Sequence, residues 1–492
     1  MVREAGILLS VSSLPSPYGI GTLGRSAFDF IDFLASAGQR YWQMLPVGPI
    51  SYGDSPYQSF STFAGNPYYI DLDRLVEEGL LTQREAEGFH WGEDPRRVDY
   101  GAIYRSRFAL LERAFERGWT RDQDSIARFA LEHRTWLADY ALFMSLKRHF
   151  GMIPWTDWPD DAIRLRQPEA VAAYRRRLDR DVRFFTYLQY LFAQQWSDLR
   201  DYAQAKGVKL VGDLPIYVAL DSSDVWSAPE LFQLDRNNFP TAVSGVPPDG
   251  FSRDGQLWGN PLYDWPRMKR NGFAWWESRL RATLERFDVL RLDHFRGLES
   301  YWSVPAGASS AAAGHWEPGP GQDFLRMLER SFPDVLIIAE DLGYITDPVR
   351  ALVDASGCPG MKVLEFAFDR REAGDYLPHN YPVNCVCYVG THDNNTILGW
   401  FQEAASEDVE TARAYFGLHE QEGWNWGMIR GGMATSARLF IAQMQDYLGL
   451  DGTARMNTPG RLGGNWQWRM LPGEASPELA QRLLRYTKLF GR

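Results

Sequence analysis

Short runs of apolar residues, each ending at a charged or polar residue, recur along this chain of 492 residues. Apolar runs of four to eight residues between turn signals are typical of strands that are buried on both faces. Between many of these runs, apolar residues recur three or four positions apart, which is the period of a helix. The pattern predicts strands at residues 6–11, 40–47, 208–213, 287–293, 334–341, 361–368, 384–393 and 454–457.

The alternation of strand and helix patterns predicts the fold class. Helical periodicity is clear at residues 26–37, 105–117, 124–150, 168–205, 274–287 and 396–447. An α/β chain with these eight strands, the last at residues 454–457, fits a (β/α)8 barrel, the TIM barrel. A bare barrel needs only about 250 residues. We therefore expect a single catalytic barrel across residues 1–492 with large, mostly helical insertions.

Two regions interrupt the alternation. Residues 72–190 are almost wholly helical by period and need no barrel strand, so they predict a helical insertion whose last helix returns to the barrel. Residues 215–270 hold several Pro and Gly residues in a long connection. Connections of that length inside a compact domain are usually functional, and we expect a loop-rich insertion there.

Three of the predicted strands end at carboxylates. One ends at Asp293, one at Glu340 and one at Asp393, with the strand 361–368 between the last two. In a TIM barrel the chemistry lies at the carboxyl ends of the strands. Because a buried charge is costly unless it is paired, strands that end in this way are expected to open into a polar site.

Arg291 lies two residues before Asp293, so the two side chains are expected on the same side of the strand. A neighbouring guanidinium lowers the pKa of a carboxyl group and keeps it ionised. An ionised carboxylate held at a strand end is what the nucleophile of a retaining glycosidase requires. A structural Arg–Asp pair at a loop is the other interpretation of this stretch alone.

These strand ends carry a resemblance to known proteins. The segments Arg291–His294, Ala339–Asp341 and Gly390–Asp393 resemble the signature regions of the α-amylase clan of retaining glycosidases. Other segments resemble the amylomaltases, the 4-α-glucanotransferases of glycoside hydrolase family 77: Ser55–Ser61, Ala64–Tyr68, Asp213–Tyr217, Trp258–Tyr263 and Arg455–Gly460. The clan often adds a C-terminal β-sandwich domain, for which this chain leaves no room, so none is expected.

The resemblance implies a retaining double displacement on α-1,4-glucans. Asp293 is expected to be the nucleophile. Glu340 is expected to protonate the leaving oxygen and then to deprotonate the acceptor, and Asp393 to stabilise the transition state. This chemistry requires no redox cofactor and no catalytic metal, so neither is expected.

The resemblance also implies substrate-binding residues near the three carboxylates, namely Ser55, Tyr57, Asp213, Phe251, Trp258, Arg291, His392 and Asn457. Phe251 and Trp258 lie in the part of the 215–270 insertion that is expected to overhang the active-site groove and to stack on the acceptor. Packing is the alternative role for Tyr57, and turn capping is the alternative for Asp213. His294 is expected either to support the site or simply to pack.

The implied partners are maltooligosaccharides, amylose and starch- or glycogen-type α-glucans, with glucose as an acceptor. Three alternatives stay open. An α-glucan hydrolase would use the same carboxylates with water as the acceptor. A noncatalytic glycan-binding barrel is expected to lack one of them, and a metal-dependent amidohydrolase barrel needs an early His-x-His that this chain lacks.

Composition and charge narrow the classes of partner. The net charge of −11 and the pI near 5.4 argue against nucleic acid and anionic membranes, which require a basic excess. No run of about 18 apolar residues is present to span a membrane, and the N-terminal apolar stretch is too short for a signal peptide. The three cysteines, Cys358, Cys385 and Cys387, are expected as free thiols. We expect a cytoplasmic protein.

Overall fold

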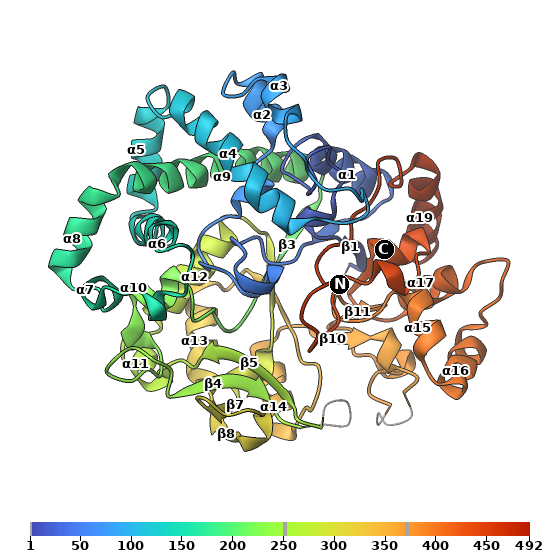
Figure 1. The fold of residues 1–492 in the computed structure, drawn as a ribbon. Helices are drawn as coiled ribbons and strands as arrows, with labels where there is room; N and C mark the ends of the chain where they lie inside the picture. Colours follow the sequence, from blue (N-terminus) through green and yellow to red (C-terminus); the bar gives the residue numbers. More distant parts are fainter. Residues whose placement is uncertain (1, 249–252, 370–373) are drawn as a thin grey trace.

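A closed barrel of parallel strands forms the centre of the computed structural model, which describes residues 2–248, 253–369 and 374–492 (Figure 1). Around the barrel the strands follow the order β1-β12-β11-β10-β9-β6-β3-β2. Their bounds are β1 Glu4–Leu8, β2 Tyr41–Gln43, β3 Lys209–Leu214, β6 Val289–Leu292, β9 Leu336–Ala339, β10 Gly360–Val363, β11 Cys385–Tyr388 and β12 Leu439–Gln443. The predicted TIM barrel is confirmed.

The last strand of the barrel is not the one that the sequence predicted. Residues 454–457 belong to a short turn and a loop, so their assignment as strand eight is wrong. The eighth strand is β12, which pairs with β11 on one side and with β1 on the other. All five residues of β12 are buried, and this short apolar run lies inside the region 396–447, for which the sequence predicts mostly helix.

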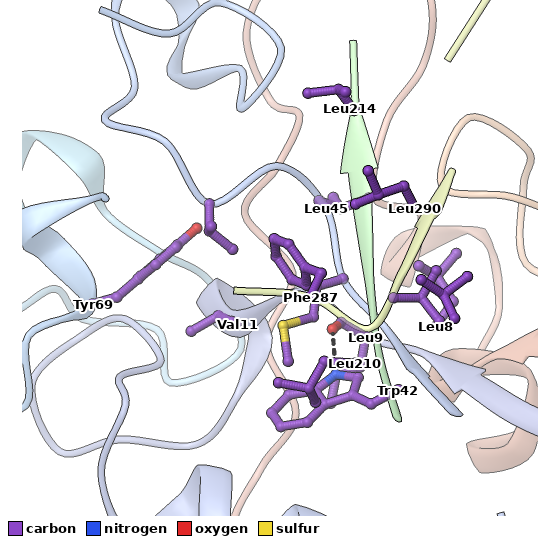
Figure 2. Close-up of a cluster of buried hydrophobic side chains, with 14 of the residues drawn as sticks. Leu8, Leu9, Val11, Trp42, Leu45, Tyr69, Leu210, Leu214, Phe287 and Leu290 are labelled. Carbon is purple, nitrogen blue, oxygen red and sulfur yellow. Dashed lines mark hydrogen bonds between the residues drawn. The ribbon is translucent and has the colours of Figure 1, made fainter. Parts of the chain in front are cut away.

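The barrel strands are buried on both faces, as parallel strands covered by helices are. Every residue of β6, β11 and β12 is buried. Figure 2 shows apolar side chains from β1, β2, β3 and β6 packed together. Within this cluster the indole Nε1 of Trp42 donates a hydrogen bond to the backbone oxygen of Leu9 at 2.8 Å. The polar atom of a fully buried tryptophan is thereby satisfied.

Helices surround the barrel and also form the segment between β2 and β3 (Figure 1). The helices are α1 Arg25–Ser36, α2 Leu72–Glu77, α3 Gln83–Glu87, α4 Tyr100–Gly118, α5 Gln123–Glu132, α6 Leu137–His149, α7 Asp161–Arg164, α8 Pro168–Arg177, α9 Asp179–Ala205, α10 Ser223–Ser227, α11 Trp265–Arg270, α12 Ala274–Leu284, α13 Gly321–Ser331, α14 Asp347–Ser356, α15 Ile397–Glu403, α16 Ser406–Phe416, α17 Trp424–Ala434, α18 Met444–Leu448 and α19 Pro477–Leu489. Helices α2 to α9 fall within residues 72–205. Helix α9 contacts α1 and β3, and so returns the chain to the barrel.

A small antiparallel sheet lies beside the barrel, and the sequence did not predict it. Its strands are β4 Ala242–Val246, β5 Gln256–Pro261, β7 Ser300–Pro305 and β8 His315–Pro318, in the order β5-β4-β7-β8. Strands β4 and β5 come from the 215–270 insertion, whereas β7 and β8 follow β6. The sheet therefore ties the insertion to the segment that comes directly after Asp293.

The two ends of the described chain meet at the barrel (Figure 1). Strand β1 pairs with β12 in the register Glu4↔Leu439. The guanidinium of Arg492 donates to the backbone oxygens of Glu4 and Ala437, at 3.1 and 3.0 Å. None of the helices in the described ranges is both long enough and apolar enough to cross a membrane.

Candidate active site

Three carboxylates lie just beyond the ends of barrel strands. Asp293 follows β6, Glu340 follows β9, and Asp393 lies five residues beyond the end of β11. Strands β6 and β9 are neighbours. The ladder continues past their ends, since Asp293 N donates to Leu214 O at 3.0 Å and Glu340 N donates to Leu292 O at 3.1 Å. The barrel therefore fixes the backbone of both residues.

Arg291 holds two carboxylates at once. Its Nη1 atom lies 2.8 Å from both oxygens of Asp213 and 2.9 Å from Asp293 Oδ1. The Arg291 side chain is only 4% exposed and that of Asp213 is fully buried. Burial lowers the pKa of Arg291, but the two carboxylates raise it more, so the guanidinium stays charged.

Burial dominates the protonation of Asp293. It raises the pKa of Asp293 to about 6, although Arg291 acts in the opposite direction. The expected effect of Arg291 is therefore present but is outweighed by burial and by the nearby negative charge of Asp213. The guanidinium keeps the rise moderate, and Asp293 is mainly ionised at neutral pH.

Glu340 holds its proton to a higher pH than Asp293. Burial raises its pKa to about 7, and the charge of Asp293 adds to the rise while Arg291 opposes it. The carboxyl group is fixed by two backbone donors, His294 N at 2.7 Å from Oε2 and Leu342 N at 2.8 Å from Oε1. Neighbouring carboxyl groups with separated pKa values can divide the roles of acid and nucleophile.

Asp393 has a different environment. Asn457 Nδ2 donates to its Oδ1 at 2.6 Å, and His392 Nε2 lies 3.3 Å from its Oδ2. Burial raises the pKa of Asp393. The charge of His392 and the hydrogen bonds from His392 and Asn457 lower it by more, so the pKa lies well below its ordinary value. Asp393 is therefore ionised at neutral pH.

Tyr57 joins the Asp213 side of the site to the Asp393 side. Its hydroxyl donates to Asp213 Oδ2 at 2.8 Å. Its ring stacks on that of His392, with centroids 5.1 Å apart and planes at 19°. Ser55 Oγ accepts from Tyr57 N at 3.3 Å and so shapes the turn that presents the tyrosine.

Trp258 approaches from the antiparallel sheet. Its ring lies edge-on to His294, with centroids 4.8 Å apart. His294 is buried in a left-handed backbone conformation, with φ 54° and ψ 47°. Burial lowers the pKa of His294 to about 3, so its ring is neutral. Phe251, the other residue expected in this loop, lies outside the described residues.

Three neighbours of the site were not predicted. The ring of Trp466 lies 5.8 Å from Tyr57 and 6.0 Å from His392. Arg455 Nη2 donates to the backbone oxygen of Asp393 at 2.7 Å, and the ring of Tyr217 lies 6.4 Å from that of Trp258. Trp466 sits in a loop without a periodic pattern, so only the folded chain shows its position, whereas Tyr217 ends the segment Asp213–Tyr217, which already carried the resemblance. Arg455 lies in a segment that already carried the resemblance.

Comparison with known proteins places the chain among sequences of one family. Residues 9–474 match the family model described as 4-alpha-glucanotransferase. The 4-alpha-glucanotransferase of Clostridium butyricum is 48% identical over 486 residues, which cover 98% of this chain and 100% of that protein. The 4-alpha-glucanotransferase of Thermus thermophilus is 47% identical and covers 98% of this chain and 97% of its own length.

Solved structures show the same similarity. The amylomaltase from Streptococcus agalactiae, solved in complex with acarbose, has a TM-score of 0.97 and 40% identity, covering 100% of this chain and 99% of its own. The amylomaltase from Corynebacterium glutamicum has a TM-score of 0.79 at 20% identity, covering 99% of this chain and 75% of its own, and shares the fold.

Proposed function

Since this chain belongs to the 4-alpha-glucanotransferase family, we propose that Asp293, Glu340 and Asp393 divide its reaction among three roles. The protein is an enzyme with glucanotransferase activity, and its substrates are α-glucans. The observation that supports the division of roles is the difference between the environments of the three carboxyl groups. One is paired with a buried guanidinium, one has its pKa raised by burial to about 7, and one is kept ionised by the charge of His392 and by hydrogen bonds.

In the first half of the reaction, an Asp293 oxygen attacks the anomeric carbon of the donor sugar. The bond from that carbon to the glycosidic oxygen breaks, and Glu340 gives its proton to the departing oxygen. A glycosyl ester on Asp293 results, with inverted configuration at the anomeric carbon. The anionic Asp393 stabilises the positive charge that develops on the sugar ring.

In the second half, Glu340 is a carboxylate and takes the proton of the acceptor hydroxyl. The acceptor oxygen attacks the same anomeric carbon, the ester bond breaks and Asp293 is released as a carboxylate. Two inversions restore the original configuration. The acceptor is proposed to be the 4-hydroxyl of an α-glucan or of glucose, and the donors are proposed to be maltooligosaccharides, amylose and starch- or glycogen-type α-glucans.

The side chains around the carboxylates are proposed to bind the sugars. His392 is proposed to hold a hydroxyl group of the cleaved sugar, while Tyr57 and Trp258 offer ring surface. Asp213 is proposed to support the sugar site through Arg291 and Tyr57, since its own carboxylate is fully buried. Asn457 and Arg291 act by fixing Asp393 and Asp293. Phe251 is proposed, from its position in the sequence, as a second acceptor contact.

A trapping experiment tests the assignment of the nucleophile. Maltosyl fluoride loses fluoride without needing a proton, so the Glu340→Gln variant should form the glycosyl ester and then hydrolyse or transfer it slowly. Mass spectrometry of the digested protein should find the added sugar on the peptide that contains Asp293. Sugar found on any other carboxylate, or no adduct at all, contradicts the assignment.

The products of maltotriose test the acceptor. Transfer to sugar should give glucose and a ladder of longer maltooligosaccharides, while the number of reducing ends stays nearly constant. This outcome requires an oriented sugar hydroxyl to outcompete water, which effective molarities far above that of water allow. A rise in reducing ends that equals the number of bonds cleaved would identify water as the acceptor.

We also propose that the protein works in the cytoplasm and that 1–492 is one catalytic barrel with insertions at 72–190 and 215–270. Free thiols support the first point, since Cys358, Cys385 and Cys387 are unpaired and thiols persist in reducing compartments. Fractionation of cells that produce the protein would test it.

A further inference from the structure

Two buried carboxyl groups flank the segment that carries Asp393. Glu365 follows β10, in the short turn Leu364–Phe366, and Asp446 follows β12, in α18. Strands β10 and β12 pair with β11 on its two sides, so these residues lie on either side of the segment that follows β11. Glu365 is 5% exposed and Asp446 is fully buried. The reaction described above uses neither.

Glu365 lies directly against the backbone of this segment. A Cβ atom built on Gly390 would lie 2.7 Å from Glu365 Oε1, so glycine alone leaves room for the carboxyl group. The same Cβ position lies 3.1 Å from Asn394 Cβ, so Glu365 and Asn394 both pack closely against Gly390. Glu365 N also donates to the backbone oxygen of Val389 at 3.2 Å. The side chain therefore packs into the inner side of the 390–394 turn.

Hydrogen bonds lead to Asp393 from Asn394, which packs with Glu365 against Gly390. Asn394 Oδ1 accepts from Thr391 N at 3.0 Å and from Thr391 Oγ1 at 2.8 Å. The Thr391 hydroxyl in turn accepts from Asp393 N at 3.3 Å. Packing around Gly390, followed by the hydrogen bonds from Asn394 through Thr391, thus connects a buried acid to the backbone of a residue proposed to act in the reaction.

The surroundings of Glu365 favour its neutral form. Burial raises the pKa of Glu365 well above its ordinary value, Asp446 and Glu403 add to the rise, and Arg455 opposes it. Burial also raises the pKa of Asp446 to about 7. Glu365 Oε1 and Asp446 Oδ2 are both buried without a hydrogen-bond partner, and an ionised oxygen in such a place carries a large desolvation cost.

We propose that Glu365 is a positioning residue for the transfer reaction: seated against Gly390, it fixes the 390–394 turn, whose hydrogen bonds through Asn394 and Thr391 set the place of Asp393. The inference rests on the role proposed for Asp393. Glu365 itself touches neither the sugar nor the reacting atoms. Its effect is on where the Asp393 carboxylate stands when charge develops on the sugar ring.

Two substitutions separate positioning from simple packing. Glu365→Gln keeps the shape, the polar end and the contact with Gly390 and carries no charge, so kcat should remain within about twofold of the wild-type value. Glu365→Met keeps the length of the side chain but removes both oxygens. Its kcat should fall about tenfold or more, because displacing a reacting group by about 1 Å can cost about a hundredfold in rate, while KM for maltotriose changes little.

A double-mutant cycle shows whether the effect passes through Asp393. In an Asp393→Asn background, Glu365→Met should lower the residual kcat by less than twofold, since the carboxylate that it positions is absent. The same tenfold loss in both backgrounds overturns the inference, as does equal loss in the Gln and Met variants. A wild-type rate for Asp393→Asn alone overturns the proposed role of Asp393 and the inference with it.

A second site on the path covers the case in which Glu365→Met does not fold. Thr391→Val has nearly the same shape but lacks the hydroxyl that links Asn394 to Asp393 N. It should lose kcat to a similar extent, with Thr391→Ser restoring it. Full kcat in Thr391→Val, with the melting temperature of the wild type, contradicts the inference. Melting temperatures of all variants identify those that fold.

Discussion

The separation between the protonation of Asp293 and that of Glu340 predicts a narrow pH optimum. As the proposed nucleophile, Asp293 must be ionised to attack, so activity should be lost as the pH falls through about 6, the pKa to which burial raises it. As the proposed acid, Glu340 must be protonated to assist departure, so activity should be lost as the pH rises through about 7. A plot of kcat/KM for maltotriose against pH should therefore be bell-shaped, with its maximum between these values.

The Glu340→Gln variant identifies the alkaline limb. With maltosyl fluoride as the donor, formation of the glycosyl ester needs no proton from residue 340, and the rate of that step should stay constant above the acid limb. If the alkaline limb persisted unchanged for this step, a group other than Glu340 would be its source.

Substitution of the nucleophile should remove the reaction without unfolding the protein. Asp293→Asn should lower kcat by about 10³-fold or more, because an amide cannot form the glycosyl ester. Asp347→Asn is a matched control, since the Asp347 side chain is fully exposed on α14 and should change kcat little. Equal activity of the two variants in the maltotriose assay would refute the nucleophile assignment.

At the scale of single residues, the sequence could place Asp293, Glu340 and Asp393 at strand ends, because an apolar run that stops at a charged residue is a local pattern. The sequence could not show that Trp466 lies beside the site, or that Glu365 packs against the segment that carries Asp393. Both depend on contacts between segments far apart in the chain, such as the 6.0 Å approach of Trp466 to His392. The sequence also could not show that the pKa of Asp293 is raised, because the burial of this side chain is known only from the folded chain.

The antiparallel sheet is the element that brings the 215–270 insertion to the active site. Strand β5 carries Trp258 to the ring of His294, directly after β6. Adjacent residues on a strand point to opposite faces, and Leu257 is accordingly exposed, whereas Trp258 is partly buried. The two residues form a natural pair for comparison.

Trp258→Ala should impair the use of acceptors more than the use of donors. We expect KM for glucose as the acceptor to rise about fivefold, which corresponds to about 1 kcal/mol of lost aromatic contact. Leu257→Ala, on the opposite face of the same strand, should leave that KM unchanged. Acceptor kinetics with a fixed maltooligosaccharide donor provide the measurement, and equal values for both variants would remove Trp258 from the acceptor site.

Strand β12 and the antiparallel sheet escaped prediction for different physical reasons. Strand β12 is only five residues long and stands between two helices, and a run that short does not distinguish a strand from a buried helix by period. Strands β4 and β8 contain Gly, Ser, His and Pro residues, which lack the apolar alternation of a typical strand. They form because they pair with β5 and β7, not because of local preference.

For the whole molecule, the pairing of β1 with β12 determines when the barrel can close. Glu4 and Leu439, about 435 residues apart, must meet before the barrel closes. At about 5–20 residues per second, a ribosome needs about 20–90 s to make that length. Throughout this time the nascent chain has an unpaired edge on β1, which a neighbouring unfolded chain can also bind.

Nascent chains stalled on the ribosome make this consequence measurable. Chains that stop before Leu439 should be digested quickly by an added protease and should bind chaperones. Chains that carry β12 fully outside the ribosome should resist digestion as the released enzyme does. Protection that arises already before β12 emerges would mean that the rest of the barrel is stable while open, and that synthesis of the final strand does not limit maturation.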